Sequence, residues 1–201
     1  MSTYVVTGSA SGMGKASAER LRDAGHVVIG VDLKNADVVA DLSTAEGRAK
    51  AITEVLARAN GVLDGAVLAA GLGPHPGREK LIAQVNYFGV VDLLTGWHEA
   101  LAKAGEARVV VFSSNSTTTV PMVPEKTIRA FLKGDAEKAI AATKMFKDNA
   151  SAMVYAGSKI AVTRWVRRTA VLPEWVEAGI RLNAVAPGAI LTPMVETQLA
   201  D

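Results

Sequence analysis

Short apolar runs alternate along this chain with longer segments whose apolar residues recur at helical spacing. This alternation constrains the fold more than any other feature, because strands separated by helices form parallel sheets with helices packed on them. The run at 27–31 is nearly all apolar, as expected for a strand buried on both faces. The sequence therefore predicts an α/β fold, a doubly wound parallel sheet with helices on both faces. We expect its six strands near residues 4–7, 27–31, 38–40, 66–70, 108–112 and 180–186.

A glycine-rich turn joins the first expected strand to the first expected helix. Gly8, Gly12 and Gly14 carry no side chains where that helix begins, so the backbone there can approach a pyrophosphate lying on the helix N-terminus. The spacing Gly-x-x-x-Gly-x-Gly differs from the G-x-G-x-x-G of many dinucleotide sites. Its position after the first strand favours a cofactor loop over a simple tight turn.

An acidic residue, Asp32, ends the second expected strand about 20 residues beyond that turn. Its carboxylate can accept hydrogen bonds from both hydroxyls of an adenosine ribose and would repel a 2′-phosphate, which favours NAD over NADP. The alternative is an aspartate that only caps a turn at the end of a strand. Lys34 weakens the preference, because its ammonium group can reach a 2′-phosphate and offset the repulsion.

Tyr155 and Lys159 stand four residues apart in a segment that we expect to be helical, so they share one helix face. A phenol has an ordinary pKa near 10 and needs nearby positive charge to exchange protons near neutral pH. The lysine supplies one charge, and an oxidised nicotinamide ring would supply a second. The alternative is a partly buried tyrosine followed by an exposed lysine, since the pair alone often arises by chance.

The composition fits one globular domain over residues 1–201 that is soluble and untargeted. Of the chain, 49% is apolar and 21% is charged, with a net charge of +2. No basic run suggests a nucleic-acid partner, and no apolar run has the length of a membrane span.

The chain contains no cysteine, which excludes disulfides and thiolate chemistry and is compatible with a reducing cytoplasm. Its histidines, His26, His75 and His98, lack metal-ligand spacing, so we expect no metal site.

Several local patterns predict further elements. Residues 81–104 form one long helix, and the capping-box spacing of Ser43 and Glu46 opens another. The stretch 117–150 is far longer than an ordinary strand-to-helix connection, so we expect a helical insertion there. Within it, Pro124 precedes one short helix, and Asp135 caps a second that runs through Ile140, Lys144 and Met145.

Taken in order, these motifs resemble the short-chain dehydrogenase/reductase family over the whole chain, and within it the bacterial 3α-hydroxysteroid dehydrogenase/carbonyl reductase subgroup. The likeness to the subgroup rests on residues 40–48, 70–74 and 85–89 and on the long insertion. The resemblance implies a Rossmann-type fold. Family chains also carry a lid and a last strand beyond the sixth, so we expect that this chain is truncated at its C-terminus. The family motifs are Thr7-Gly8-x-x-x-Gly12-x-Gly14, Asn86, the serines after the fifth strand, Tyr155-x-x-x-Lys159 and Pro187-Gly188.

The resemblance also implies catalytic roles. Tyr155 would be the acid or base at the substrate oxygen, Lys159 would lower the pKa of the phenol and hold the nicotinamide ribose, and Ser114 would donate a hydrogen bond to that oxygen. Ser113 and Ser116 compete with Ser114 for this role.

Asn86 corresponds to a family residue that helps to hold a water relaying protons to the lysine. Its alternative is a simple buried polar contact.

The family's cofactor contacts carry over to matching positions. Asp41 and Leu42 match the adenine-contacting pair, although Asp41 can simply end its strand, and the backbone of Ile190 with Thr192 matches the contacts to the carboxamide. Residues 68–71 read Leu-Ala-Ala-Gly where the family usually has Asn-Asn-Ala-Gly. The expected cofactor-binding residues are Thr7, Gly8, Ser11, Gly12, Met13, Gly14, Asp32, Asp41, Leu42, Ala70, Gly71, Tyr155, Lys159, Pro187, Gly188, Ile190 and Thr192.

The expected function is an NAD(H)-dependent oxidoreductase that interconverts a secondary alcohol and a ketone, with a 3α-hydroxysteroid and its 3-oxosteroid as one candidate pair. The alternatives are a 3-oxoacyl carrier-protein reductase and a non-catalytic NAD-binding sensor. Because the insertion would cover the surface that most family members use for tetramers, we expect a homodimer.

Overall fold

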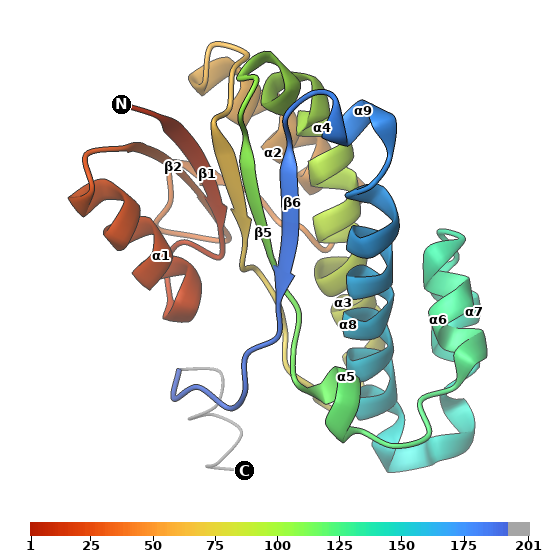
Figure 1. Cartoon of the computed structure of the whole chain (residues 1–201). Helices are drawn as coiled ribbons and strands as arrows, with labels where there is room; N and C mark the ends of the chain where they lie inside the picture. The colour runs from red at the N-terminus through yellow and green to blue at the C-terminus, as the bar shows by residue number, and fades with distance from the viewer. Residues whose placement is uncertain (193–201) are drawn as a thin grey trace.

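The computed structural model describes residues 1–192, and its sheet is parallel throughout. The strands run in the order β3-β2-β1-β4-β5-β6, so consecutive strands are placed outward from β1 in both directions (Figure 1). The predicted α/β doubly wound sheet is confirmed. The strands are β1 (Thr3–Thr7), β2 (Val27–Asp32), β3 (Val38–Val39), β4 (Gly65–Leu68), β5 (Arg108–Phe112) and β6 (Arg181–Val185).

Helices lie on both faces of this sheet. One face carries α1, and the other carries α2, α4 and α8 (Figure 1). β1 pairs with β2 on one side and β4 on the other, so the order reverses there and leaves a crevice at the carboxyl ends of these strands. The main helices are α1 (Gly12–Asp23), α2 (Ala45–Arg58), α4 (Gly89–Lys103) and α8 (Ala150–Thr169), and the short α9 (Pro173–Val176) precedes β6.

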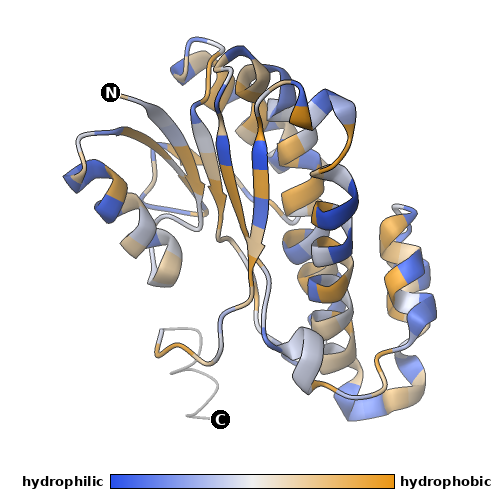
Figure 2. Ribbon diagram, viewed as in Figure 1, coloured by the Kyte–Doolittle hydropathy of each residue, from blue (hydrophilic) through white to orange (hydrophobic). Residues whose placement is uncertain are grey.

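The main hydrophobic core lies between the sheet and the helices α2, α4 and α8. Trp97 on α4 and Leu63 before β4 are fully buried in it. The strands are largely apolar, whereas the exposed Arg181 and Asn183 interrupt β6 (Figure 2). A smaller cluster of Val6, Val28 and Ala18 joins the sheet to α1. None of the helices within residues 1–192 combines the length and apolar character that a membrane crossing requires.

The long helix expected at 81–104 is interrupted. α3 (Glu79–Ala83) is followed by a π-helical turn, η1 (Gln84–Phe88), before α4 begins. The N–H of Gly89 donates to the carbonyl of Gln84 five residues earlier, which is the hydrogen bond of a π turn. The wider turn accommodates the fully buried side chain of Asn86.

The stretch after β5 is helical, and it packs on α8. The helix expected after Pro124 is confirmed, whereas the next one ends at Ala141, and Lys144 and Met145 belong to a separate 3₁₀ turn. Asp135 caps the second of these helices, the one that ends at Ala141, as predicted: its carboxylate accepts a hydrogen bond from the N–H of Lys138. The elements are α5 (Ser116–Thr119), α6 (Glu125–Leu132), α7 (Ala136–Ala141) and the 3₁₀ turn η2 (Lys144–Asn149).

The start of α2 differs from the predicted capping box. Thr44 is the N-cap, and its hydroxyl accepts from the N–H of Gly47 at 2.9 Å, whereas the expected pair was Ser43 and Glu46. The expectation was one residue too early, because the N–H of Ser43 is already used by the carboxylate of Asp41 in a local turn.

Candidate functional site

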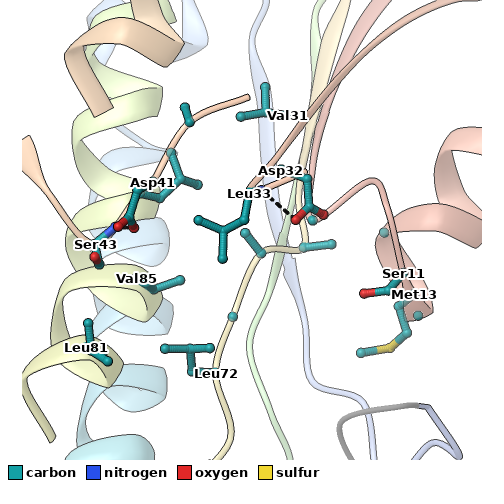
Figure 3. Close-up of a pocket in the computed structure, with 18 of the residues that line it drawn as sticks. Ser11, Met13, Val31, Asp32, Leu33, Asp41, Ser43, Leu72, Leu81 and Val85 are labelled. Atoms are coloured by element: carbon teal, nitrogen blue, oxygen red, sulfur yellow. Dashed lines mark hydrogen bonds between the residues drawn. The ribbon is translucent and has the colours of Figure 1, made fainter. Parts of the chain in front are cut away.

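A cavity of about 460 Å³ opens at the carboxyl ends of β1, β2 and β4, where the strand order reverses (Figure 3). This is the position at which doubly wound sheets bind ligands. Many of the predicted cofactor residues line it, namely Gly8, Ser11, Gly12, Met13, Gly14, Asp32, Asp41, Leu42, Ala70, Gly71 and Thr192.

The glycine turn forms one wall of the cavity, and close backbone contacts fix its shape. Gly8 has φ +70°, and a Cβ there would lie 2.9 Å from the backbone nitrogen of Ala70. A Cβ on Gly14 would collide with the carbonyl oxygen of Gly8. The N-cap Ser11 makes no side-chain capping bond, and no acidic residue stands in the first turn of α1. This end of α1 therefore suits an anionic group.

Asp32 faces the cavity from the end of β2 (Figure 3). Its two oxygens accept from the N–H groups of Ala10, at 2.9 Å, and Leu33, at 2.7 Å. The carboxylate thus shapes the turn, as the alternative interpretation expected, and it keeps lone pairs for a ribose because each oxygen can accept more than one hydrogen bond. Lys34 is exposed and is not among the cavity residues, whereas Arg78 is one of them.

The opposite wall combines the loop after β3 with the helical segment after β4 (Figure 3). Asp41, Leu42 and Ser43 line it from the loop, and Leu81 and Val85 line it from α3 and η1. This pairing of a carboxylate with apolar side chains suits a flat aromatic base that carries an amino group.

Tyr155 and Lys159 lie on α8, one turn apart, as the sequence predicted. Lys159 is buried, and its Nζ donates to the carbonyl of Phe112 at 2.8 Å. Burial lowers the pKa of this ammonium group to about 8. Tyr155 is half-buried. Neither side chain lines the cavity itself.

The three candidate serines after β5 have different surroundings. The hydroxyl of Ser113 lies 2.6 Å from Thr163 Oγ1 and donates to the carbonyl of Lys159, so it holds β5 against α8. Ser114 Oγ accepts from the N–H of Ser116 at 3.1 Å, which leaves its own hydrogen for another acceptor. Within residues 1–192, the buried hydroxyl of Ser116 has no hydrogen-bond partner.

Asn86 clamps the segment that follows β4. Its Oδ1 accepts from the N–H of Leu72 at 2.8 Å, and its Nδ2 donates to the carbonyl of Leu72 at 2.9 Å. This is the buried polar contact that we set against the water-relay role, and the relay stays a prediction.

Gly71 connects the cavity to the catalytic candidates. A Cβ built on this cavity residue would lie 3.4 Å from Asn86 Oδ1 and 3.6 Å from Lys159 Nζ. The ammonium group and the amide therefore stand directly beside the cavity wall.

The remaining predicted cofactor residues are not among those that line the cavity. Thr7 is buried, and its hydroxyl accepts from the N–H of Ala70 at 3.1 Å, a bond made where the family's usual asparagines are absent. The carbonyl of Pro187 accepts a hydrogen bond from the N–H of Asn115. This bond links the segment after β6 to the segment after β5 that carries the candidate serines. Gly188 lies near the same asparagine, and Ile190 is exposed and is not among the residues that line the cavity.

Several residues that line the cavity were not predicted from the sequence. Leu81 and Val85 had a usable signal, because apolar residues four apart share one helix face. Leu72 and Arg78 lie in an irregular segment, where no periodic pattern indicates which side chains face the cavity. The missed residues are Val31, Leu33, Ala40, Ser43, Ala69, Leu72, Arg78, Leu81 and Val85.

Residues 1–192 contain no group of three His, Cys, Asp or Glu side chains placed to hold a metal ion.

Comparison with known proteins gives consistent relatives. The sequence profile of the family described as Enoyl-(Acyl carrier protein) reductase matches residues 8–201. The chain is 41% identical over 201 residues to 3-alpha-hydroxysteroid dehydrogenase/carbonyl reductase of Comamonas testosteroni, covering 100% of this chain and 77% of that protein. It is 30% identical to the coniferyl-alcohol dehydrogenase of Pseudomonas sp. (strain HR199 / DSM 7063), covering 95% of this chain and 74% of that protein.

Among solved structures, the chain resembles 3-alpha-hydroxysteroid dehydrogenase from Pseudomonas sp. B-0831 complexed with NADH. The TM-score is 0.91 at 44% identity, and the match covers 100% of this chain and 77% of the other.

Proposed function

Because the chain belongs to the short-chain dehydrogenase/reductase family, we propose that it is an NAD(H)-dependent oxidoreductase that interconverts a secondary alcohol and a ketone. The observation that carries this function is the close approach at Gly71, where the wall of the cavity meets the buried ammonium of Lys159 and the amide of Asn86.

The cavity fits NAD. The glycine turn and the start of α1 suit the pyrophosphate, Asp32 suits the adenosine ribose, and the wall of Asp41 and Leu42 suits the adenine. When bound, the nicotinamide accepts or supplies a hydride. The solved relative from Pseudomonas sp. B-0831 is complexed with NADH, which supports the same choice here.

Tyr155 exchanges a proton with the substrate oxygen. In oxidation its phenolate takes the proton of the alcohol, and in reduction its hydroxyl returns a proton to the ketone oxygen. Lys159, on the same face of α8, stabilises the phenolate by its positive charge. With a pKa of about 8, this ammonium group is charged at neutral pH. Ser114 has a free hydroxyl hydrogen to hold the substrate oxygen.

The substrate that we propose is a 3α-hydroxysteroid or the corresponding 3-oxosteroid. Two relatives, at 41% and 44% identity, are both named 3-alpha-hydroxysteroid dehydrogenases. The carbonyl reductase named with the first relative extends the proposal to other ketones.

The test is to measure NADH formation from NAD across 3α-hydroxysteroids, their 3β epimers and simple secondary alcohols, and to repeat it with NADP. We expect turnover of the 3α epimers with a strong preference for NAD. Equal rates with NADP would refute the preference, and tight NAD binding without turnover of any alcohol would favour a sensor.

We further propose that the protein is a cytoplasmic homodimer. The lack of cysteine is compatible with a reducing cytoplasm. The insertion supports the dimer, because α6 and α7 pack on the α8 surface that most family members use for tetramers (Figure 1). Thr127 of α6 lies against Gly157 of α8, and Arg164 of α8 donates to Glu125 of α6 at 2.7 Å.

A further inference from the structure

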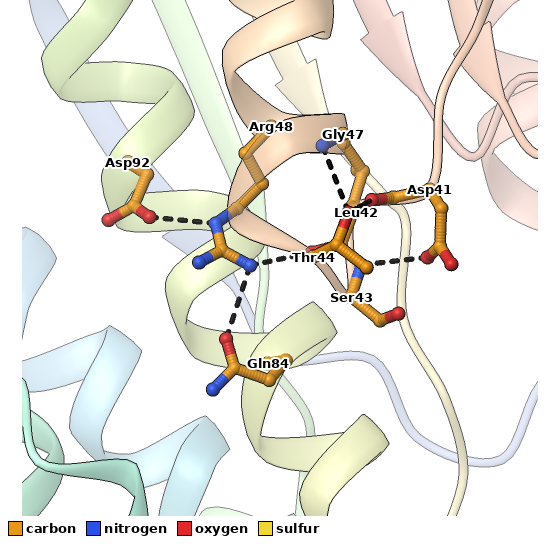
Figure 4. Close-up of polar contacts among 8 residues, drawn as sticks. All are labelled: Asp41, Leu42, Ser43, Thr44, Gly47, Arg48, Gln84 and Asp92. Atoms are coloured by element: carbon orange, nitrogen blue, oxygen red, sulfur yellow. Dashed lines mark hydrogen bonds and ion pairs between the residues drawn. The ribbon is translucent and has the colours of Figure 1, made fainter.

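A buried arginine lies behind the cavity, near the start of α2 (Figure 4). Arg48 is 7% exposed, and its Nη1 donates both to the carbonyl of Leu42 at 3.0 Å and to Gln84 Oε1 at 3.1 Å. Its Nε donates to Asp92 of α4 at 2.7 Å. One side chain therefore joins the loop after β3, the π turn η1 and α4.

The charge of Arg48 does not explain its burial. Its acidic partner within residues 1–192, Asp92, has a side chain that is 41% exposed, and a half-exposed ion pair stabilises a fold only weakly. An apolar side chain of similar volume would avoid the cost of taking a guanidinium out of water. Besides the bond to Asp92 and the contact of the guanidinium with the Phe88 ring, 6.0 Å from its centroid, an apolar side chain lacks the pair of hydrogen bonds to the neutral oxygens of Leu42 and Gln84.

These two oxygens belong to the two segments that together form the wall opposite the glycine turn. Leu42 lines it from the loop after β3, and Gln84 is followed directly by Val85, which lines it from η1. The loop's other hydrogen bonds are local, from the N–H of Ser43 to Asp41 and from Thr44 to the carbonyl of Asp41. They fix the shape of the loop, whereas one bond of Arg48 Nη1 holds the loop at the carbonyl of Leu42 and the other holds η1 at Gln84.

The bond from Arg48 to Gln84 also links Arg48 to the residues around Lys159. Gln84 begins the π turn in which Asn86 is the third residue, and Asn86 holds both backbone groups of Leu72. The residue before Leu72 is Gly71, on which an added Cβ would lie 3.6 Å from Lys159 Nζ. A shift of η1 would therefore reach the amide and the segment that flank the ammonium group.

We propose that Arg48 is a positioning residue, which holds the loop of Asp41 and Leu42 in place for the adenosine end of the cofactor and, through Gln84, sets the orientation of the Asn86 turn. The inference rests on the proposed function, since both effects are defined for NAD(H) binding and turnover.

The experiment measures the Kd of NADH by fluorescence and kcat with the best alcohol for the wild type and three variants. Arg48→Met removes all three hydrogen bonds, and we expect a Kd roughly tenfold higher together with a lower kcat. Gln84→Met removes only the bond to η1, so we expect kcat to fall several-fold while the Kd stays within about twofold of the wild type. This separation of Kd from kcat is not expected from a general loss of stability.

Lys50→Met is the matched control. Lys50 is on the same helix and donates to a backbone carbonyl, that of Val39, but it is exposed and outside the cavity wall. We expect its Kd and kcat to equal those of the wild type. Circular dichroism melts identify any variant whose folded fraction has fallen, and Arg48→Lys, which keeps the charge with one nitrogen, supplies a second variant that we expect to show the raised Kd.

Wild-type Kd and kcat in a folded Arg48→Met would overturn the inference, as would a Gln84→Met variant that changes the Kd and not kcat. A wild type that neither binds NADH nor turns over an alcohol would instead overturn the proposed function.

Discussion

At the scale of single residues, the site depends on two groups of α8 in different surroundings. Lys159 is buried and hydrogen-bonded to the carbonyl of Phe112, whereas Tyr155 is half-buried. A buried ammonium group reduces stability by itself, so its retention beside a cofactor-sized cavity indicates a functional role.

Replacing Tyr155 with phenylalanine tests the proton-transfer role. The change removes one oxygen and leaves the ring, so we expect kcat to fall by at least about 100-fold while NADH binding and the melting temperature change little. Steady-state kinetics and NADH titration would measure this. Near-normal kcat in Tyr155→Phe would show that another group carries the proton.

The lowered pKa of Lys159 predicts a pH-dependent stability. In the unfolded chain this amine holds its proton up to its ordinary pKa of 10.5, whereas the folded protein releases it near pH 8. Between these values the unfolded state binds more protons, so stability rises with pH through this window and is insensitive to this group below it. Relative to Lys159→Met, the wild type should gain up to about 3 kcal/mol between pH 8 and 10.5.

Urea unfolding of the wild type and Lys159→Met at several pH values measures this difference. The exposed Lys50, changed to methionine, is the control and should give a curve parallel to the wild type. A constant difference between wild type and Lys159→Met across the window would contradict the lowered pKa.

At the scale of elements, the strands and the helix faces were predictable from the sequence. Which polar groups pair in local turns and helix caps was not. The short apolar runs placed all six strands, because most residues of the strands are buried fully or in part. It did not predict η1, because the π turn depends on Asn86 reaching Leu72, a partner 14 residues away. The cavity's glycines and Asp32 had sequence signals, whereas Arg78 had none.

The cap of α2 offers a direct test of one such choice. Thr44 accepts from the N–H of Gly47, while Ser43 makes no capping bond. We expect Thr44→Ala to lose about 1 kcal/mol of unfolding free energy and Ser43→Ala to lose little. Urea denaturation of the two variants measures the contrast, and the reverse order would restore the capping box at Ser43.

At the scale of the whole molecule, the insertion decides which surfaces are free for assembly. The apolar side of α6 is used internally, since Ile128 and Phe131 are buried, and Phe131 packs on Tyr87 with ring centroids 5.3 Å apart. Burial raises the pKa of this Tyr87 phenol to about 12, so it stays protonated as a structural group. α8 is consequently covered by the chain's own helices on this side.

Light scattering of the purified protein tests the assembly that follows. We expect a mass of about two chains of 21.0 kDa each, unchanged on dilution through the micromolar range. A mass of four chains would contradict the proposed dimer and show that the α8 surface is available despite the insertion.

The close approach of Gly8 to Ala70 has a mechanical consequence. With less than a methyl group of free space between them, the turn after β1 and the segment after β4 cannot slide independently, and the bond from Ala70 to Thr7 joins them further. A dinucleotide that pushes on the glycine turn would therefore displace Gly71 as well, and with it the backbone next to the ammonium group. Occupancy at one end of the crevice would in this way be transmitted to the reacting end as a rigid displacement.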